Sequence, residues 1–137
     1  MIITFSGLPG SGKSSVSKLV AKKLKYPIYN AGDEVRKFAK KHNMELTEFL
    51  HHTDLVKKLD NKVKTLGKKK NYIIDSRLSA YFLPKAEFRI YLKAPLKIRA
   101  RRIHERQKIS LLKSLKKTKV RQKEEVNKYK ELYNVDY

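Results

Sequence analysis

The sequence predicts a three-layer α/β domain, in which helices cover both faces of a short parallel sheet. Short runs of β-branched and aromatic residues alternate along the chain with longer segments of helical period, which is typical of strand–helix–strand units. A glycine-rich turn follows the first of these runs. The length of 137 residues is enough to bury one hydrophobic core, so we expect a single domain over residues 1–137.

Four strands are expected, and each is a short apolar run that ends at turn-forming or polar residues. They are residues 2–5, 26–29, 72–75 and 88–92. Helical spacing of apolar residues predicts the helices. These cover residues 13–25, 33–41, 47–50, 55–66, the segment from Pro95 to a loop near 108–110, a short apolar helix over 111–115 and a last helix over 119–132. We expect Asp33 to cap the second helix and Gly67 to end the fourth.

The composition excludes several classes of protein. No apolar stretch is long enough to span a bilayer, so no membrane association is expected. The absence of cysteine rules out disulfides and cysteine-based metal sites, and it fits a cytoplasmic protein. We also expect the protein to be a monomer. Lys and Arg number 34 against 13 Asp and Glu, a formal charge of +21. Much of this excess is Lys on expected outer helix faces, which is typical of a solvated surface, and weak, nonspecific nucleic-acid binding is the alternative.

The strongest motif is a phosphate-binding loop. Residues Gly7–Ser14 match G-x-x-x-x-G-K-S/T at every fixed position, after an expected strand and before an expected helix. Glycines let the backbone aim several N–H groups at one anion, and the helix adds the positive end of its dipole. Lys13 is expected to act on the β- and γ-phosphates of ATP, and the Ser14 hydroxyl to bind Mg²⁺. The expected ATP-binding residues are Gly7, Leu8, Pro9, Gly10, Ser11, Gly12, Lys13, Ser14 and Ser15. The motif predicts a P-loop NTPase fold.

A second anion site is expected at the same edge of the sheet. Arg36 follows the second strand, and Arg77 follows the third, which ends at Asp75. The carboxyl ends of parallel strands are where ligands gather. Arg36 and Arg77 are therefore expected to hold the phosphate group of an acceptor, while Asp75 orients Mg²⁺ and its waters. An acceptor that is itself a phosphate is already ionised near neutral pH, so no general base is needed.

A cluster of arginines follows the fourth strand. Arg99, Arg102 and Arg106 have i, i+3, i+7 spacing and share one helix face, while Arg121 lies on the returning helix. Three cations on one stripe repel each other unless an anion lies between them, so the stripe fits a lid that closes on nucleotide phosphates. A basic face that binds RNA or is only solvated is the alternative.

Several segments together resemble the adenylate/cytidylate kinase group. They are Gly7–Ser14, the run Asn30–Arg36 and the run Ile74–Ser79. The runs Leu92–Ala100, with Arg102 and Arg106 behind it, and Tyr129–Asp136 are similar to the archaeal-type cytidylate kinases, and the resemblance covers essentially the whole chain. It implies ATP- and Mg²⁺-dependent phosphorylation of CMP and dCMP. It also implies three parts, which are a core over 1–31 and 67–95, helices that bind the monophosphate over 32–66, and a lid with its returning helix over 96–137.

The resemblance carries roles onto individual positions. Lys13 and Ser14 match the residues that serve ATP and Mg²⁺, and Arg36 and Arg77, with Asp33 of the same motif, match those that hold the CMP phosphate. The catalytic residues that it implies are Lys13, Arg102, Arg106 and Arg121, the three arginines acting from the lid. Ala31 fits the cytidylate branch, because adenylate kinases usually place Thr there. Asp60 and Ser76 are candidates for reading the cytosine base.

One departure from the family concerns the end of the chain. Family members usually add a fifth parallel strand and a final helix after the equivalent of Tyr129–Asp136, whereas this sequence stops at Tyr137. We therefore expect a sheet of four strands. Two alternatives to cytidylate kinase activity stay open. One is a kinase for AMP or UMP, and the other is a P-loop protein that binds RNA or the ribosome with little turnover.

Overall fold

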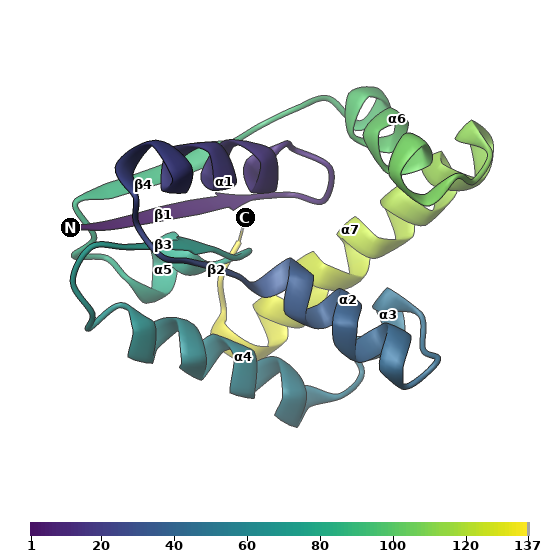
Figure 1. The fold of residues 1–137 in the computed structure, drawn as a ribbon. Helices are drawn as coiled ribbons and strands as arrows, with labels where there is room; N and C mark the ends of the chain where they lie inside the picture. Colours follow the sequence, from purple (N-terminus) through teal and green to yellow (C-terminus); the bar gives the residue numbers. More distant parts are fainter. Residues whose placement is uncertain (137) are drawn as a thin grey trace. The chain divides into compact units, whose positions relative to one another are not determined.

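The sheet has four strands, and all of its neighbouring strands are parallel. A computed structural model describes residues 1–136 and gives the strand order β2-β3-β1-β4 (Figure 1). The strands are β1 (Ile2–Gly7), β2 (Ile28–Asn30), β3 (Tyr72–Asp75) and β4 (Phe88–Leu92). This confirms the predicted fold class and the four predicted strands, with ends that differ by one or two residues.

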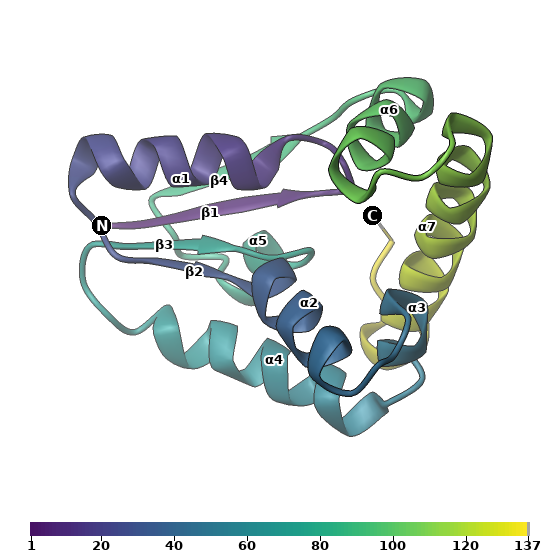
Figure 2. The same cartoon turned by 45° about the vertical axis from the view of Figure 1, so that its right-hand side comes forward.

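Seven helices lie in the described residues. They are α1 (Lys13–Leu24), α2 (Ala31–Lys41), α3 (Leu46–Phe49), α4 (Thr53–Leu66), α5 (Ser79–Phe82), α6 (Leu96–Gln107) and α7 (Leu111–Tyr133). Helices α2, α3 and α4 follow one another after β2 and return the chain to β3 (Figure 2). Among residues 1–136, none of the helices has both the length and the apolar character that a bilayer crossing needs.

The chain divides into two compact units. The first contains Met1–Gly7 and Gly12–Leu92, and the second contains Leu8–Ser11 and the residues from Lys93 onward. The boundary therefore passes through the glycine-rich loop. The functional division into core, monophosphate-binding helices and lid stays a prediction, since compactness does not define it, and its last residue, Tyr137, lies outside the described residues.

In the first unit, apolar side chains pack on both faces of the sheet. Ile3 and Phe5 pack with Ala21 of α1 on one face. On the other face, Ile2 and Ile74 pack with Val63 of α4. All six residues of β1 are buried, as expected for a central parallel strand that is covered on both sides (Figure 1).

The strand register brings polar residues together at one edge. Phe5 pairs with Asp75, and Asn30 of β2 pairs with the same Asp75. Parallel neighbours in register point to the same side of the sheet. The ends of β2 and β3 therefore place the side chains of Asn30 and Asp75 side by side.

Strand β4 lies at an edge of the sheet. Within the described residues it pairs with β1 alone. Its aromatic residues stay in contact with solvent, because Phe88 is 54% and Tyr91 is 41% exposed. Arg89 lies between them in the sequence.

In the second unit, α6 packs against α7. The Ser114 hydroxyl donates a hydrogen bond to the carbonyl oxygen of Ala100 at 2.6 Å and is buried. The prediction of two separate helices over 111–115 and 119–132 is wrong, since α7 runs unbroken through 111–133. The linking residues contain no Gly or Pro, and Thr118 satisfies its hydroxyl within the helix by donating to the Ser114 carbonyl oxygen at 2.7 Å.

Two details of the helix ends differ from expectation. Asp33 does not cap α2, because the helix begins two residues earlier and Asn30 is its N-cap, with its side chain accepting a hydrogen bond from the Asp33 N–H. The short helix α5 has no counterpart among the predicted elements. Gly67 ends α4 as predicted, but with a right-handed φ of −62°. Space explains this glycine, since a Cβ there would overlap the Leu83 side chain.

We predict that Gly67→Ala destabilises the protein by about 1–3 kcal/mol, because the added methyl group overpacks against Leu83. The ordinary effect of Gly→Ala at an unstrained φ is the opposite, a gain of about 0.4–1 kcal/mol from the unfolded chain. Urea unfolding of the variant, and of Gly67→Ala combined with Leu83→Ala as the control that relieves the overlap, measures the difference. A stabilised single variant would contradict the close contact.

Candidate active site

The loop between β1 and α1 uses glycine where no other residue fits. Gly12 is the N-cap of α1 with φ of 91°, and no side chain caps the helix. Gly10 has φ of 76°, and a Cβ there would lie 2.6 Å from the Arg99 carbonyl oxygen. The N–H groups of the first turn of α1 are thus left for a ligand. A helix N-terminus after such a loop is suited to binding phosphate.

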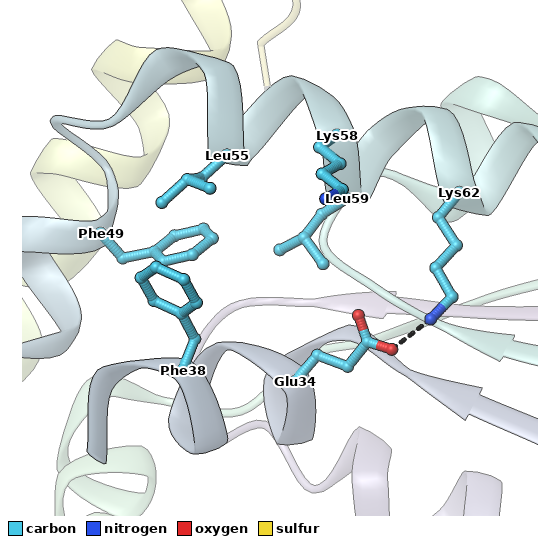
Figure 3. Close-up of a pocket in the computed structure, with 7 residues that line it drawn as sticks. All are labelled: Glu34, Phe38, Phe49, Leu55, Lys58, Leu59 and Lys62. Atoms are coloured by element: carbon cyan, nitrogen blue, oxygen red, sulfur yellow. Dashed lines mark hydrogen bonds and ion pairs between the residues drawn. The ribbon is translucent and has the colours of Figure 1, made fainter. Parts of the chain in front are cut away.

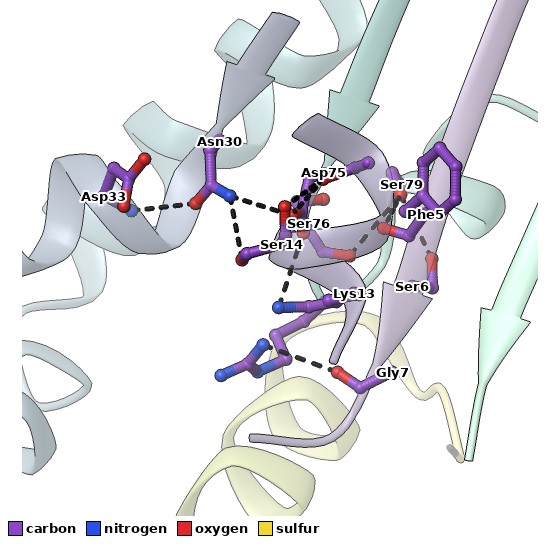
Figure 4. A network of polar contacts seen from close by, with 12 residues as sticks. Phe5, Ser6, Gly7, Lys13, Ser14, Asn30, Asp33, Asp75, Ser76 and Ser79 are labelled. Carbon is purple, nitrogen blue, oxygen red and sulfur yellow. Dashed lines mark hydrogen bonds and ion pairs between the residues drawn. The ribbon is translucent and has the colours of Figure 1, made fainter. Parts of the chain in front are cut away.

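A buried carboxylate lies behind the loop. Asp75 is fully buried, and its Oδ1 lies 3.3 Å from Lys13 Nζ. Its Oδ2 accepts hydrogen bonds from Ser17 Oγ at 2.9 Å and from Asn30 Nδ2 at 2.8 Å (Figure 4). A buried charge is tolerated only when it is paired and hydrogen-bonded, and these three partners provide that compensation. Lys13 and Asp75, which the sequence assigned to one site, are therefore brought together.

Ser14 joins the same network. Its Oγ accepts a hydrogen bond from Asn30 Nδ2 at 2.9 Å. The second predicted metal residue, Asp75, keeps Oδ1 without a hydrogen bond among the described residues, although that oxygen faces Lys13. A hydroxyl and a carboxylate are the oxygen donors that Mg²⁺ prefers, so these residues fit that ion. Ser15 lies in the first turn of α1 with its side chain exposed.

The acceptor residues lie on α2 and after β3. Arg36 pairs with Asp33, and Asp33 also pairs with Lys18 of α1 at 3.1 Å. Burial would raise the pKa of Asp33, but the hydrogen bonds and charges of Arg36 and Lys18 outweigh it and hold that pKa below its usual 3.8. Arg77 donates to the Gly7 carbonyl oxygen at 3.4 Å, at the start of the loop.

Both base-reading candidates are buried. Ser76 is buried beside Asp75, and its Oγ has no hydrogen-bond partner among the described residues. Asp60 is buried in α4 and helps to raise the pKa of Tyr29, after burial and Glu34. Since Tyr29 and Asn30 are consecutive in β2, their side chains point to opposite faces of the sheet. Asp60 therefore lies on the face opposite the Asn30–Asp75 contact.

A cavity of about 230 Å³ lies between α2, α3 and α4. Its lining residues are Glu34, Phe38, Phe49, Leu55, Lys58, Leu59 and Lys62 (Figure 3). Glu34 pairs with Lys62 across it. At 100° per residue, Arg36 lies on the opposite side of α2 from both Glu34 and Phe38. The cavity is therefore separate from the face of α2 that carries the acceptor arginine.

In the second unit, the arginine stripe is only partly as predicted. Arg99 is 4% exposed, and its guanidinium donates to the carbonyl oxygens of Ala94 at 3.0 Å and Pro9 at 3.3 Å and to Gln122 Oε1 at 2.7 Å. The prediction that it shares an anion-facing stripe is therefore wrong, because carbonyl oxygens satisfy it inside the unit. Arg102 is exposed and donates to the Gly10 carbonyl oxygen at 3.0 Å.

The remaining two lid candidates lie in different surroundings. Arg106 is exposed in the last turn of α6. Arg121 is 13% exposed and pairs with Glu125, one turn along α7, at 3.0 Å. Their catalytic roles stay predictions.

Two residues of the site were not predicted from the sequence. Asn30 and Ser17 both donate to Asp75, yet neither was singled out for a role. Asn30 ends a strand, and that position is the signal that led to Asp75 on the next strand. Ser17 lies one turn after Lys13 on α1, where polar residues are common, so the sequence carried no comparable signal for it.

The parallel sheet and its glycine-rich loop define this chain as a P-loop NTPase fold. Solved structures support that class. The shikimate kinase from Bacteroides thetaiotaomicron superposes with a TM-score of 0.64 at 14% identity, covering 96% of this chain and 82% of that one. An uncharacterized protein from Eubacterium ventriosum reaches 0.71 at 18% identity, covering 100% and 80%. At these identities the likeness establishes the fold alone.

Sequence comparison defines the family. A family model described as an AAA domain matches residues 3–128. The cytidylate kinase of Methanocaldococcus jannaschii is 36% identical over 144 residues, which cover 99% of this chain and 81% of that protein. The cytidylate kinase of Methanocella arvoryzae is 38% identical over 141 residues, covering 99% and 80%. The chain therefore belongs to the cytidylate kinase family, a family of P-loop nucleoside monophosphate kinases. Membership implies ATP and nucleotide substrates.

We predict that the ion pairs of Asp33 with Arg36 and Lys18 stabilise the fold only at pH values where the Asp33 carboxyl is ionised. Because its folded-state pKa is lowered, this contribution is complete above pH 3.8 and is lost as the pH falls through the folded-state value. Asp33 is 36% exposed, so solvent limits the effect to about 0.2–1 kcal/mol. Unfolding free energies of the wild type and Asp33→Asn should differ at pH 6 and converge in acid. A difference that is independent of pH would contradict this pairing.

Proposed function

We propose that this protein transfers the γ-phosphoryl group of ATP to CMP or dCMP. The observation that carries the proposal is the Lys13–Asp75–Asn30–Ser14 network, which joins the glycine-rich loop to the carboxyl ends of β2 and β3. The choice of CMP or dCMP as the acceptor is based on the relatives named cytidylate kinase, whose match covers 99% of this chain.

On the donor side, the chain's own groups stabilise the phosphates. Backbone N–H groups of the glycine-rich loop bind the phosphates of ATP, and Lys13 neutralises charge that develops on the transferred group. Mg²⁺, when bound through the Ser14 hydroxyl and oriented by Asp75, adds charge neutralisation at the phosphate oxygens. The ion pair with Asp75 also fixes the Lys13 side chain, so less freedom is lost when ATP binds.

On the acceptor side, Arg36 and Arg77 hold the phosphate of CMP, and Asp33 orients Arg36. Guanidinium groups bind phosphate through two parallel hydrogen bonds, which fixes the direction of the attacking oxygen. Since that oxygen is already ionised near neutral pH, the site needs no general base. Positioning and charge carry the reaction.

Residues 96–137 act as the lid in this proposal, and residues 32–66 bind the monophosphate. Arg102, Arg106 and Arg121 supply cations from the lid, whereas Arg99 holds the Pro9 carbonyl oxygen and shapes the second unit. A lid that excludes water strengthens every such charge interaction.

The high positive charge suits small anionic substrates. A charge of +21 speeds the capture of nucleotides and favours weak, salt-sensitive contact with RNA. We take the enzyme to be a cytoplasmic monomer. Phosphorylation of AMP or UMP, or RNA binding with little turnover, are the outcomes that would replace the proposal.

An acceptor panel tests the proposed reaction. With ATP and Mg²⁺, we expect CMP and dCMP to stimulate ADP release, and AMP and UMP to do so less, because the chain matches cytidylate kinases. A coupled assay measures the rate for each acceptor. No stimulation by CMP would overturn the proposal, and a preference for AMP or UMP would replace the acceptor.

We predict that Lys13→Ala lowers kcat by at least about 10²- to 10³-fold, the range for removing one group that stabilises developing charge. Lys22→Ala is the matched control, since Lys22 is an exposed lysine of the same helix. Circular dichroism should show both variants folded. Retained turnover in Lys13→Ala would locate the chemistry elsewhere.

A further inference from the structure

One side-chain amide contacts three functional parts of the first unit. Asn30 Nδ2 donates to Ser14 Oγ at 2.9 Å and to Asp75 Oδ2 at 2.8 Å. Its Oδ1 accepts from the Asp33 N–H at 2.9 Å, at the beginning of α2 (Figure 4). Asn30 is 8% exposed, and its contact with Asp75 is buried, whereas those with Ser14 and the Asp33 N–H are part-buried. All of its side-chain polar atoms are therefore engaged.

The chemistry of these contacts needs an amide. Only Asn or Gln offers two N–H donors and an oxygen acceptor in one planar group. The two donors meet a hydroxyl and a carboxylate, and the acceptor meets a backbone N–H. The strand pairing of Asn30 with Asp75 fixes the distance between them, and the shorter of the two amide side chains spans it.

The contact with Ser14 has a direction. Because the amide N–H donates, Ser14 Oγ accepts, and one lone pair of the oxygen is used. Its second lone pair is left for a cation, and its proton points away from Asn30. On Asp75, the amide and Ser17 both use Oδ2, so Oδ1 remains on the side of Lys13. Asn30 thus fixes the Ser14 oxygen with one lone pair unused and the Asp75 carboxylate with Oδ1 on the side of Lys13.

We propose that Asn30 is a positioning residue that couples the Mg²⁺–ATP site to the acceptor helix. Its NH₂ group orients Ser14 and Asp75, and its oxygen fixes the first turn of α2 through the Asp33 N–H, three residues before Arg36. The inference rests on the proposed function for the identity of the two ligands. Residues that orient metal ligands typically contribute about 10- to 100-fold to metal affinity.

A helix cap alone would explain one of the three contacts, so the test separates the cap from the NH₂ group. Asn30→Ser and Asn30→Asp both keep an oxygen that can cap α2. Serine is too short to hold Asp75 as well, and aspartate replaces the donor by a second carboxylate beside it. Asn30→Ala removes both functions. Tyr29→Phe is the matched control, because the Tyr29 hydroxyl ties β2 to α2 through Glu34 at 3.0 Å without touching Ser14 or Asp75.

The experiment measures ATP binding by calorimetry with and without Mg²⁺, in the absence of acceptor. For Asn30→Ser and Asn30→Asp we expect the gain in affinity that Mg²⁺ gives to fall by about 10- to 100-fold. Tyr29→Phe should keep the wild-type gain. Circular dichroism and urea unfolding check that each variant is folded, with Asn30→Ser expected to stay close to the wild type.

A second measurement tests whether binding at the ATP site changes the affinity of the acceptor site for CMP. CMP affinity is measured with and without an unreactive ATP analogue and Mg²⁺. Asn30→Ser should bind CMP alone as the wild type does but lose the effect of the analogue, whereas Asn30→Ala should also bind CMP alone more weakly.

Two outcomes overturn the inference. One is wild-type Mg²⁺ dependence in both Asn30→Ser and Asn30→Asp, which would leave Asn30 as a helix cap only. The other is an equal loss in Tyr29→Phe, which would assign the effect to the whole junction of β2 and α2. Failure of the proposed function is a separate result, since it is read from CMP-stimulated ADP release by the wild type. The binding of ATP and Mg²⁺ still tests Asn30 in that case.

Discussion

The candidate site depends on one fully buried carboxylate. Asp75 has no contact with solvent, so its charge must be compensated by neighbours on other elements. Lys13 comes from the loop end of α1, Ser17 from its next turn and Asn30 from β2. Each partner is fixed because leaving a buried charge unpaired is costly. The need to compensate this charge thereby sets the positions of the loop lysine and of the start of α2.

The features that the sequence predicted are those with local causes. The four strands are short apolar runs between turn residues, and the loop Gly7–Ser14 needs its glycines for backbone reasons that hold in any protein. Asp75 and Arg77 were predicted to lie at one edge because a parallel sheet collects the carboxyl ends of its strands there, and Asp75 does lie beside Lys13. Periodicity and topology were sufficient for these residues.

The features that were not predicted from the sequence depend on the contacts that a side chain makes in the folded protein. Arg99, Arg102 and Arg106 look alike by spacing, but Arg99 is buried and donates to the Pro9 and Ala94 carbonyl oxygens, whereas Arg102 and Arg106 are exposed. Asn30 and Asp33 are both good N-cap residues, and the end of β2 decides between them. The break expected near residues 116–118 is bridged by a hydrogen bond within α7. Such contacts are set by neighbours that spacing does not reveal.

The exposed edge of strand β4 suggests a function for the high positive charge, which is to oppose pairing between copies of the protein. Its outer side leaves backbone N–H and C=O groups without a strand neighbour among residues 1–136, beside the exposed rings of Phe88 and Tyr91. Such an edge is a template on which another copy's strand can add. Arg89 within it, and a like charge of +21 on every copy, oppose that approach by repulsion. Electrostatic repulsion therefore opposes this strand addition, and the opposition weakens as ionic strength rises.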